Sequence, residues 1–360
     1  MKVGYAVLYD NGELVISKNH TILSKKVYKD YGAFEDTSVP WKNDSEWINK
    51  VNILDQVKSN CMKEWFANCT NLTSLIDFTN LDISDCEDFS FMFGNCMVLQ
   101  NIKALESWNV SNGTDFLGMF SSCKFLQDIS ALESWNVSNG TDFSYMFYNC
   151  TSLQDISALE SWNLSNGTDF SSMFRYCTSL QNISALESWN VSNGTDFSWM
   201  FSSCTALQNI KALEDWNVSN GTDFSCMFNF CTSLQDISAL ESWNVSNGRN
   251  FSSMFRSCPS LQNINALESW NVSNGRNFSF MFDSCTSLQD ISALEDWNVS
   301  NGTDFSYMFS YCTSLQNISL PNSLRYLDEN MFKDCNPNLK IRWKQYLYTY
   351  ADLLEYKKIY

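Results

Sequence analysis

The 360-residue sequence contains one histidine, His20, and four prolines. A single imidazole cannot supply the paired acid and base groups, or the triads, on which much hydrolytic chemistry depends. The sequence also lacks a glycine-rich phosphate loop, and no apolar run approaches the ~20 residues of a membrane-spanning helix. We therefore expect a protein that is not an enzyme, uses no cofactor and does not insert into a membrane.

Positive charge is also scarce. Lys and Arg number 23 against 40 Asp and Glu, which gives a formal net charge of −17. Binding to nucleic acid requires clustered cations that neutralise phosphates, so we expect no nucleic-acid partner. The usual meaning of such a balance is a solvated acidic face, and a cationic partner is the more specific alternative.

The fourteen cysteines include no Cys-x-x-Cys pair from which a zinc site could be built. Ten of them recur at one interval from Cys69 to Cys312. Neighbours in such a column could approach disulfide distance, but their Cβ atoms would point the same way and strain the bond. We predict a ladder of buried, reduced thiols that act as small hydrophobic groups, with disulfide bridges as the alternative.

What the sequence does contain is a 27-residue unit, of which residues 131–157 are a representative copy. The tryptophan of the unit recurs without a slip, at Trp108, Trp135, Trp162, Trp189, Trp216, Trp243, Trp270 and Trp297. A fixed period of this length indicates a solenoid, because units too short to bury their own apolar face must stack and share a core.

The apolar residues of that copy first recur at helical spacing, at Phe143, Met146, Phe147 and Cys150. This spacing predicts one face of a short helix or 3-10 turn, and the preceding Asp142 predicts its N-cap. The apolar residues that follow are interrupted by Ser, Asn and Gly, a pattern typical of short strands joined by turns. We predict one short helix and one or two short strands per unit.

The motif Met-Phe-x-x-Cys-x-x-Leu-x-x-Ile, followed by Leu-x-x-Trp-x-Val-Ser-Asn, resembles the repeat of the BspA-like leucine-rich-repeat surface proteins. The branch that it resembles has units that run Trp-Asp-Val-Ser-Asn-Val-Thr-Asp-Met-Ser-x-Met-Phe. The resemblance covers most of the chain and implies an elongated leucine-rich-repeat-like solenoid of the α/β repeat class. It also implies a role in adhesion or protein recognition at a cell surface.

This chain departs from that pattern twice, with Gly140 where the family has Val and Phe143 where it has Met. We expect these changes to loosen one core column and to tighten another.

The two ends of the chain differ from the repeat. Two alternating segments around Asn11-Gly12 predict a β-hairpin, and apolar residues at helical spacing from Trp343 predict a helix. That helix either caps the last unit or attaches the protein to a partner. The predicted domains are an N-terminal cap with a β-hairpin over 1–57, repeats of 27 residues over 58–319, a final 23-residue repeat over 320–342 and a C-terminal helix over 343–360.

The N-terminal ten residues carry one Lys and become polar at once, without the apolar core of a secretory signal. The resemblance nevertheless implies a cell-surface or extracellular protein. A virion and the cytoplasm are the alternative locations.

Two acidic columns run through the repeats. In the first column, Asn250 and Asn277 stand where other units have Asp. A backbone cap tolerates this exchange, whereas a Ca²⁺ site tolerates it poorly, so we predict caps and no bound metal. The second column, from Glu106 to Glu295, never varies. Like charges one strand spacing apart, about 4.8 Å, repel, so we expect these Glu side chains to face water or a cation.

Three places in each unit vary freely: the residue before Met and the two residues after Phe. On a helical turn they lie opposite the buried residues and form one exposed stripe. Drift at surface positions should give polar residues, yet nine of the 27 places are Phe, Tyr or Trp. Exposed aromatics with Arg are typical of interface hot spots and of sugar-stacking platforms. The predicted partner-binding residues are Tyr145, Tyr148, Arg175, Tyr176, Trp199, Phe230, Arg256, Phe280, Tyr307 and Tyr311.

Two functions fit these observations. The leading hypothesis is a non-catalytic adhesion or recognition protein that binds a protein or a glycan on a cell surface through a regular solenoid face. The alternative is a structural component of a larger assembly, such as a virion or a surface appendage, which self-associates through its C-terminal helix.

Overall fold

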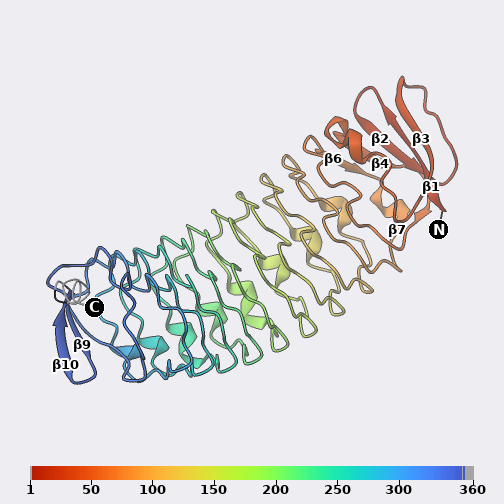
Figure 1. Ribbon diagram of the computed structural model, residues 1–360. Helices are drawn as coiled ribbons and strands as arrows, with labels where there is room; N and C mark the ends of the chain where they lie inside the picture. The colour runs from red at the N-terminus through yellow and green to blue at the C-terminus, as the bar shows by residue number, and fades with distance from the viewer. Residues whose placement is uncertain (1, 351, 353–360) are drawn as a thin grey trace. The chain divides into compact units, whose positions relative to one another are not determined.

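The computed structural model describes residues 2–350 and 352 (Figure 1). The chain forms two compact units. The first unit comprises the chain up to Gly167 together with Tyr176–Trp189, and the second comprises Thr168–Arg175 together with the chain from Asn190 onward.

The first unit opens with a five-stranded sheet of strand order β3-β1-β2-β4-β6. Strands β1 and β2 pair antiparallel across the turn at Asn11 and Gly12, and β4 and β6 then add in parallel. A side chain at Gly12 would collide with Asn49, since a Cβ there would lie 2.3 Å from the Asn49 amide nitrogen. The strands are β1 (Lys2–Tyr9), β2 (Glu13–Ser17), β3 (Val27–Glu35), β4 (Lys50–Ile53) and β6 (Ser74–Ile76). That this sheet caps the repeats remains a prediction.

Shorter elements lie between β3 and β6 along the chain or directly after β6. They are the 3-10 helices η1 (Lys42–Trp47) and η2 (Phe78–Asn80) and the parallel pair of β5 (Val57–Lys58) and β7 (Leu81–Asp82). The buried Trp41 donates its indole N–H to the carbonyl of Trp65 at 2.5 Å. Both indoles, like the tryptophans of the repeats, are thereby part of the core.

Each 27-residue repeat contributes one 3-10 helix over its x-Ala-Leu segment, as Figure 1 shows. In the first unit these helices are η3 (Lys103–Leu105), η4 (Ser130–Leu132), η5 (Ser157–Leu159) and η6 (Ser184–Ser188). In the second unit they are η7 (Lys211–Leu213), η8 (Ser238–Ser242), η9 (Asn265–Leu267) and η10 (Ser292–Leu294).

Of the two forms predicted for the Phe-x-x-Met-Phe-x-x-Cys segment, the short helix is wrong and the structure instead has turns closed by bonds three residues apart. In the repeat at 224–231, the N–H groups of Phe224, Cys226, Phe228 and Phe230 bond forward to carbonyls of the next repeat at 2.8–2.9 Å. Only the intervening N–H groups bond back within the segment, three residues earlier. Cys226 and Phe230 have φ angles of 56° and 58°, a left-handed conformation that no right-handed helix contains. The segment is therefore a series of single turns that pairs with its neighbours in parallel.

The apolar residues of this segment are nevertheless buried as predicted. Phe, Met, Phe and Cys are buried in every 27-residue repeat, and the side chains of successive repeats stack. In the second unit, for example, the rings of Phe224 and Phe251 lie 5.6 Å apart, and those of Trp216 and Trp243 lie 6.4 Å apart. Each repeat therefore buries its apolar face against its neighbours.

The two departures from the family pattern, Gly140 and Phe143, lie in contact and compensate one another. The expectation that one column loosens and another tightens is therefore wrong. A Cβ atom added at Gly140 would lie 2.3 Å from the Phe143 ring, and one at Gly221 would lie 2.4 Å from the Phe224 ring. The larger Phe ring thus fills the space that the missing side chain leaves free.

The Asp column caps turns rather than a helix. Asp142 accepts a hydrogen bond from the N–H of Ser144 at 2.9 Å, and Asn250 accepts the same bond from Ser252 at 3.2 Å. Asn250 also donates its amide to Asp223 at 3.1 Å. The side-chain oxygen, which both residue types possess, is what the turn requires.

The cysteine ladder forms without disulfides among the fourteen cysteines, all of which the structure describes. From Cys96 to Cys335, each ladder thiol donates to the carbonyl of a Phe in the preceding repeat at 3.0–3.3 Å. Burial raises the pKa of Cys123 to about 12, so the thiol stays protonated and keeps its donor. The predicted burial of the ladder thiols is confirmed, and their reduced state remains a prediction.

The start of the helix predicted over 343–360 is wrong, because Trp343 and residues 346–349 belong to a three-stranded sheet, β10-β9-β8. Of the other described residues in that range, Tyr350 and Asp352 are helical. Strand β9 (Lys340–Trp343) adds in parallel to β8 (Asn317–Ser319), and β10 (Tyr346–Thr349) returns antiparallel to β9. Lys344, at a φ of 56°, reverses the chain. The helical spacing of the apolar residues did not decide the structure here, because β9 pairs with β8 and extends the parallel stack of the repeats. Residues 351 and 353–360 of the predicted helix lie outside the described residues.

The contact between the repeat glycine and the Phe ring three residues later yields a first prediction. Gly221→Val should destabilise the protein by about 1–3 kcal/mol, the usual cost of overpacking a core, because its side chain meets the Phe224 ring. Adding Phe224→Met should recover much of this loss, and a denaturant-unfolding double-mutant cycle measures the coupling. Additive costs would show that the two positions are independent.

The Asp column yields a second prediction. Burial is the largest cause that raises the pKa of Asp196, and the neighbouring Asp169 and Asp223 raise it further. A raised carboxyl pKa means that the group stabilises the fold when protonated and that this contribution disappears as pH rises through its folded pKa. Asp196→Asn should therefore raise the melting temperature at pH 7, since Asn keeps the turn acceptor and removes the charge.

That gain should shrink as pH falls toward the ordinary carboxyl range near ~4. Asp196→Ala is the control, because it removes the acceptor as well and should cost roughly 1 kcal/mol, as the loss of a cap does. Equal stability of the Asn and Ala variants would contradict the capping role.

Candidate partner-binding surface

The described residues offer little for catalysis or for metal binding. His20 lies at the surface, with its Nε2 2.7 Å from the Asp30 carboxylate. No three His, Cys, Asp or Glu side chains among residues 2–350 and 352 lie together as metal ligands would. Within the same residues, no helix is long and apolar enough to cross a bilayer.

The invariant Glu column lies in solvent, as predicted. Every member from Glu106 to Glu295 is exposed, apart from the half-buried Glu214 beside Lys211. Successive repeats leave acid-lined hollows on this face, of about 440 Å³ around Asp128 and Glu133 and about 390 Å³ around Asp236 and Glu241. These carboxylates account for part of the negative charge, and Glu214 forms an ion pair with Lys211.

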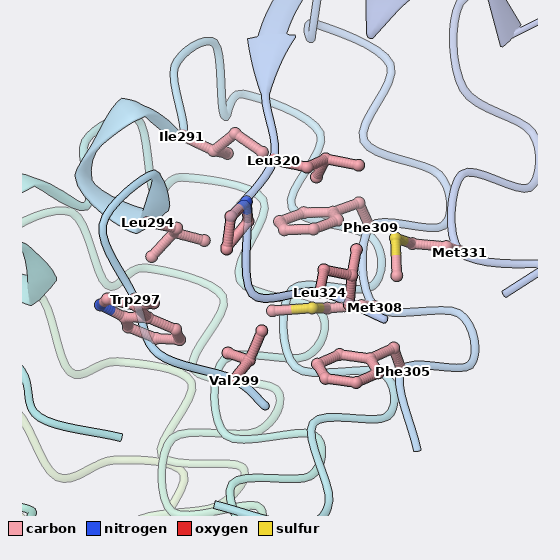
Figure 2. A pocket seen from close by; sticks show the side chains of 11 residues that line it. Ile291, Leu294, Trp297, Val299, Phe305, Met308, Phe309, Leu320, Leu324 and Met331 are labelled. Atoms are coloured by element: carbon pink, nitrogen blue, oxygen red, sulfur yellow. The ribbon is translucent and has the colours of Figure 1, made fainter. Parts of the chain in front are cut away.

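A small apolar cavity lies where the last 27-residue repeat meets the 23-residue repeat (Figure 2). Trp297, Phe305, Met308 and Met331 are among the side chains that surround it, and the cavity has a volume of about 20 Å³. A cavity of this size holds about one water molecule, and this one exposes no polar surface. It is therefore a packing defect of the repeat junction and not a ligand site.

The ten predicted partner-binding residues are all exposed or half-buried. The largest exposures are those of Tyr145 at 38%, Phe230 at 44% and Tyr311 at 48%. Their surface position does not come from a helix. Tyr145, Tyr176, Trp199, Phe230, Phe280, Tyr307 and Tyr311 are all left-handed, and this conformation directs their side chains away from the buried Phe, Met and Cys.

Three of the ten residues group together in the first unit. The Tyr145 and Tyr148 rings lie 5.5 Å apart, and Tyr148 meets Tyr176 edge to face at 5.6 Å. Aromatic pairs in such geometries gain about 0.5–1.5 kcal/mol beyond the area that they bury. The three phenols therefore form one cluster that the inter-repeat hydrogen bonds hold in place.

The other seven residues belong to the second unit, where cations join the rings. The Arg175 guanidinium lies 3.8 Å from the centre of the Trp199 ring. The Arg256 guanidinium lies 4.9 Å from the Phe280 ring, which stacks on Tyr307 at 4.7 Å. Phe230 and Tyr311 stand more exposed than these stacked rings.

Some residues of this surface were not predicted. Asp283 is 5% exposed and accepts a 3.0 Å bond from the Arg256 Nε, which fixes the guanidinium over Phe280. The Lys333 ammonium lies 5.6 Å from the centre of the Tyr307 ring. Asp283 and Lys333 each follow a Met-Phe pair, a place that the sequence showed to be variable. Nothing in the sequence, however, indicates that either residue lies near an aromatic ring or its Arg partner.

Comparison with solved structures finds bacterial leucine-rich-repeat proteins over nearly the whole chain. A leucine-rich cell surface protein from Faecalibacterium prausnitzii is 17% identical, with 96% of this chain and 95% of that chain covered and a TM-score of 0.49. A leucine-rich repeat protein from Bacteroides ovatus is 15% identical, with 96% and 99% covered and a TM-score of 0.37. One from Eubacterium ventriosum is 13% identical, with 95% and 93% covered and a TM-score of 0.40.

Because all three TM-scores are below 0.5, these similarities carry no argument about the fold. The evidence for the repeat architecture is the hydrogen bonding between successive repeats. A comparison with curated proteins found no match.

The sequence matches one family model three times, over residues 60–182, 155–263 and 234–342, and these overlapping matches together cover residues 60–342. The chain therefore belongs to the family described as "Mycoplasma protein of unknown function, DUF285".

Proposed function

We propose that this protein is a non-catalytic recognition protein that binds a partner on a cell surface through the aromatic and Arg side chains of its variable columns. The observation that carries the proposal is the group of Arg175, Trp199, Arg256, Phe280 and Tyr307 in the second unit. It places stacked cations and rings on the surface of a protein whose net charge is −17.

Backbone constraint makes these side chains suited to binding. The N–H groups of Trp199 and Phe280 bond to Ser225 and Ser306 of the next repeats at 2.8 and 2.9 Å. The backbone that carries each ring is thus fixed, and the Trp199 and Phe280 rings are further restrained by their contacts with Arg175 and Tyr307. Ordering a free side chain on binding costs about 0.5–1.5 kcal/mol, and this restraint reduces that cost. A left-handed backbone costs an L-residue about 1–2 kcal/mol, so small polar residues or Gly would be the cheaper choice here if packing alone mattered.

A polypeptide is the partner that this group fits best. Aromatic residues and Arg are enriched among the hot spots of protein interfaces, and a partner's carboxylates would meet the guanidinium edges. A glycan remains the second class of partner for the same rings.

The alternative function, a structural component of an assembly, gains one observation. Strand β10 lies at the edge of its sheet, and Tyr346 and Leu347 within it are 55% and 64% exposed. An exposed apolar edge strand favours pairing with another chain. Self-association would then use this hairpin rather than a helix at Trp343.

The leading proposal is tested with a random peptide phage library selected against the immobilised full-length protein. Replacing Tyr145, Trp199, Phe230 and Tyr307 by Ser should weaken binding of the enriched peptides about tenfold or more, which is at least ~1.4 kcal/mol. The melting temperature should change little, because Ser172, Ser203, Ser253 and Ser257 already occupy the same columns.

A matched control replaces two exposed aromatics outside these columns, Tyr28 and Phe125, by Ser. Peptides that lose affinity equally for both variants, or no enriched peptides at all, would contradict the proposal. Dimers or larger species in sedimentation, abolished by Tyr346→Ser with Leu347→Ser, would favour the structural alternative.

A further inference from the structure

The variable columns form a hollow near the start of the first unit. The place directly after the Phe at 66, 93 and 120 holds Ala67, Gly94 and Ser121 in three successive repeats, whereas the next repeat holds Tyr148. These small residues leave an open hollow of about 360 Å³. That volume lies within the ~300–1,000 Å³ of small-molecule sites.

One wall of the hollow is the aromatic ring of Phe91. Phe91 is left-handed, at a φ of 52°, and its ring lies over Gly118, where an added Cβ would be 2.4 Å from it. Gly118 is the glycine of a column that elsewhere carries Tyr, Ser, Trp, Cys or Phe. Its lack of a side chain is what allows the Phe91 ring to lie in this position.

The remaining walls are polar, and their charges balance. The Lys42 ammonium pairs with the Glu64 carboxylate at 2.5 Å. The Asn95 amide donates to the Asn68 amide oxygen at 3.0 Å. Among the residues that the structure describes, this arrangement leaves the Asn68 amide nitrogen and the Asn95 amide oxygen without hydrogen-bond partners, with both side chains lining the hollow.

We propose that this hollow binds one pyranose unit of a neutral glycan. The C–H face of a sugar ring stacks on an aromatic ring, and its hydroxyls bond as donors and acceptors to amides and carboxylates. Phe91 supplies the ring, while Asn68, Asn95 and Glu64 supply the polar groups. The balanced Lys42–Glu64 pair selects against a strongly charged ligand, and the open side lets the glycan chain continue into solvent.

This site is distinct from the polypeptide surface of the second unit and does not depend on it. Saturation-transfer NMR with the methyl glycosides of glucose, galactose, mannose and N-acetylglucosamine tests it, each at millimolar concentration with the full-length protein. At least one glycoside should receive saturation, most strongly at the protons of its apolar face.

Two variants locate the binding. Ser121→Tyr copies Tyr148 of the next repeat and should fill the hollow, reducing saturation transfer about fivefold or more. Phe91→Leu should do the same by removing the ring, whereas Phe91→Tyr should restore binding. Phe125→Ser, on an exposed aromatic outside the hollow, is the control and should leave the signal unchanged. Melting curves show that each variant is folded.

Absence of saturation transfer to all four glycosides overturns the proposal, as does a signal that survives both Ser121→Tyr and Phe91→Leu. Neither result affects the recognition function, because that proposal is measured by peptide binding to the Tyr145, Trp199, Phe230 and Tyr307 variant. Conversely, sugar binding that survives in that variant separates the hollow from the polypeptide surface.

Discussion

Hydrogen bonds between the backbones of successive repeats are the interaction on which the rest of this structure depends. In the segment from Phe224 to Cys231, alternate N–H groups bond forward to the next repeat, and the others close turns within the segment. The chain can satisfy both sets only if two residues per segment adopt the left-handed conformation. Their unfavourable local energy is offset because every backbone group of a buried segment needs a partner.

This backbone arrangement separates the side chains of the segment into two sets. Phe, Met, Phe and Cys face the core, where the rings stack and the ladder thiols donate to Phe carbonyls. Most of the left-handed residues are exposed or half-buried, whereas Ser172 and Cys226 are buried. The size of the side chains then decides what each stretch of surface offers. Small residues such as Gly94 leave a hollow in the first unit, whereas Trp199 and Phe280 place half-buried rings beside Arg side chains in the second.

The period of the repeat, the buried columns, the burial of the ladder thiols and the exposed Glu residues could all be predicted from the sequence, because each depends only on the recurrence of a residue type. The helix over Phe143–Cys150 could not be excluded, since a series of three-residue turns gives the same apolar spacing as a helix. The start of the C-terminal helix at Trp343 was predicted wrongly for a related reason. Apolar spacing alone does not show that this part of the chain pairs with β8 as the next parallel strand, β9. The link between Gly140 and Phe143, and the ring of Phe91 over Gly118, depend on distances that no spacing reveals.

The central claim is that each Phe-x-x-Met-Phe-x-x-Cys segment is a series of turns with two left-handed residues rather than a helix, and Ser257→Gly tests it most directly. Ser257 has a φ of 56°, and its N–H bonds to the carbonyl of Asp283 in the next repeat at 2.7 Å. In a left-handed position, glycine relieves about 1–2 kcal/mol of backbone strain, so chemical denaturation should show a more stable variant. A variant less stable by roughly 0.5–1 kcal/mol, the cost of glycine within a helix, would contradict this account.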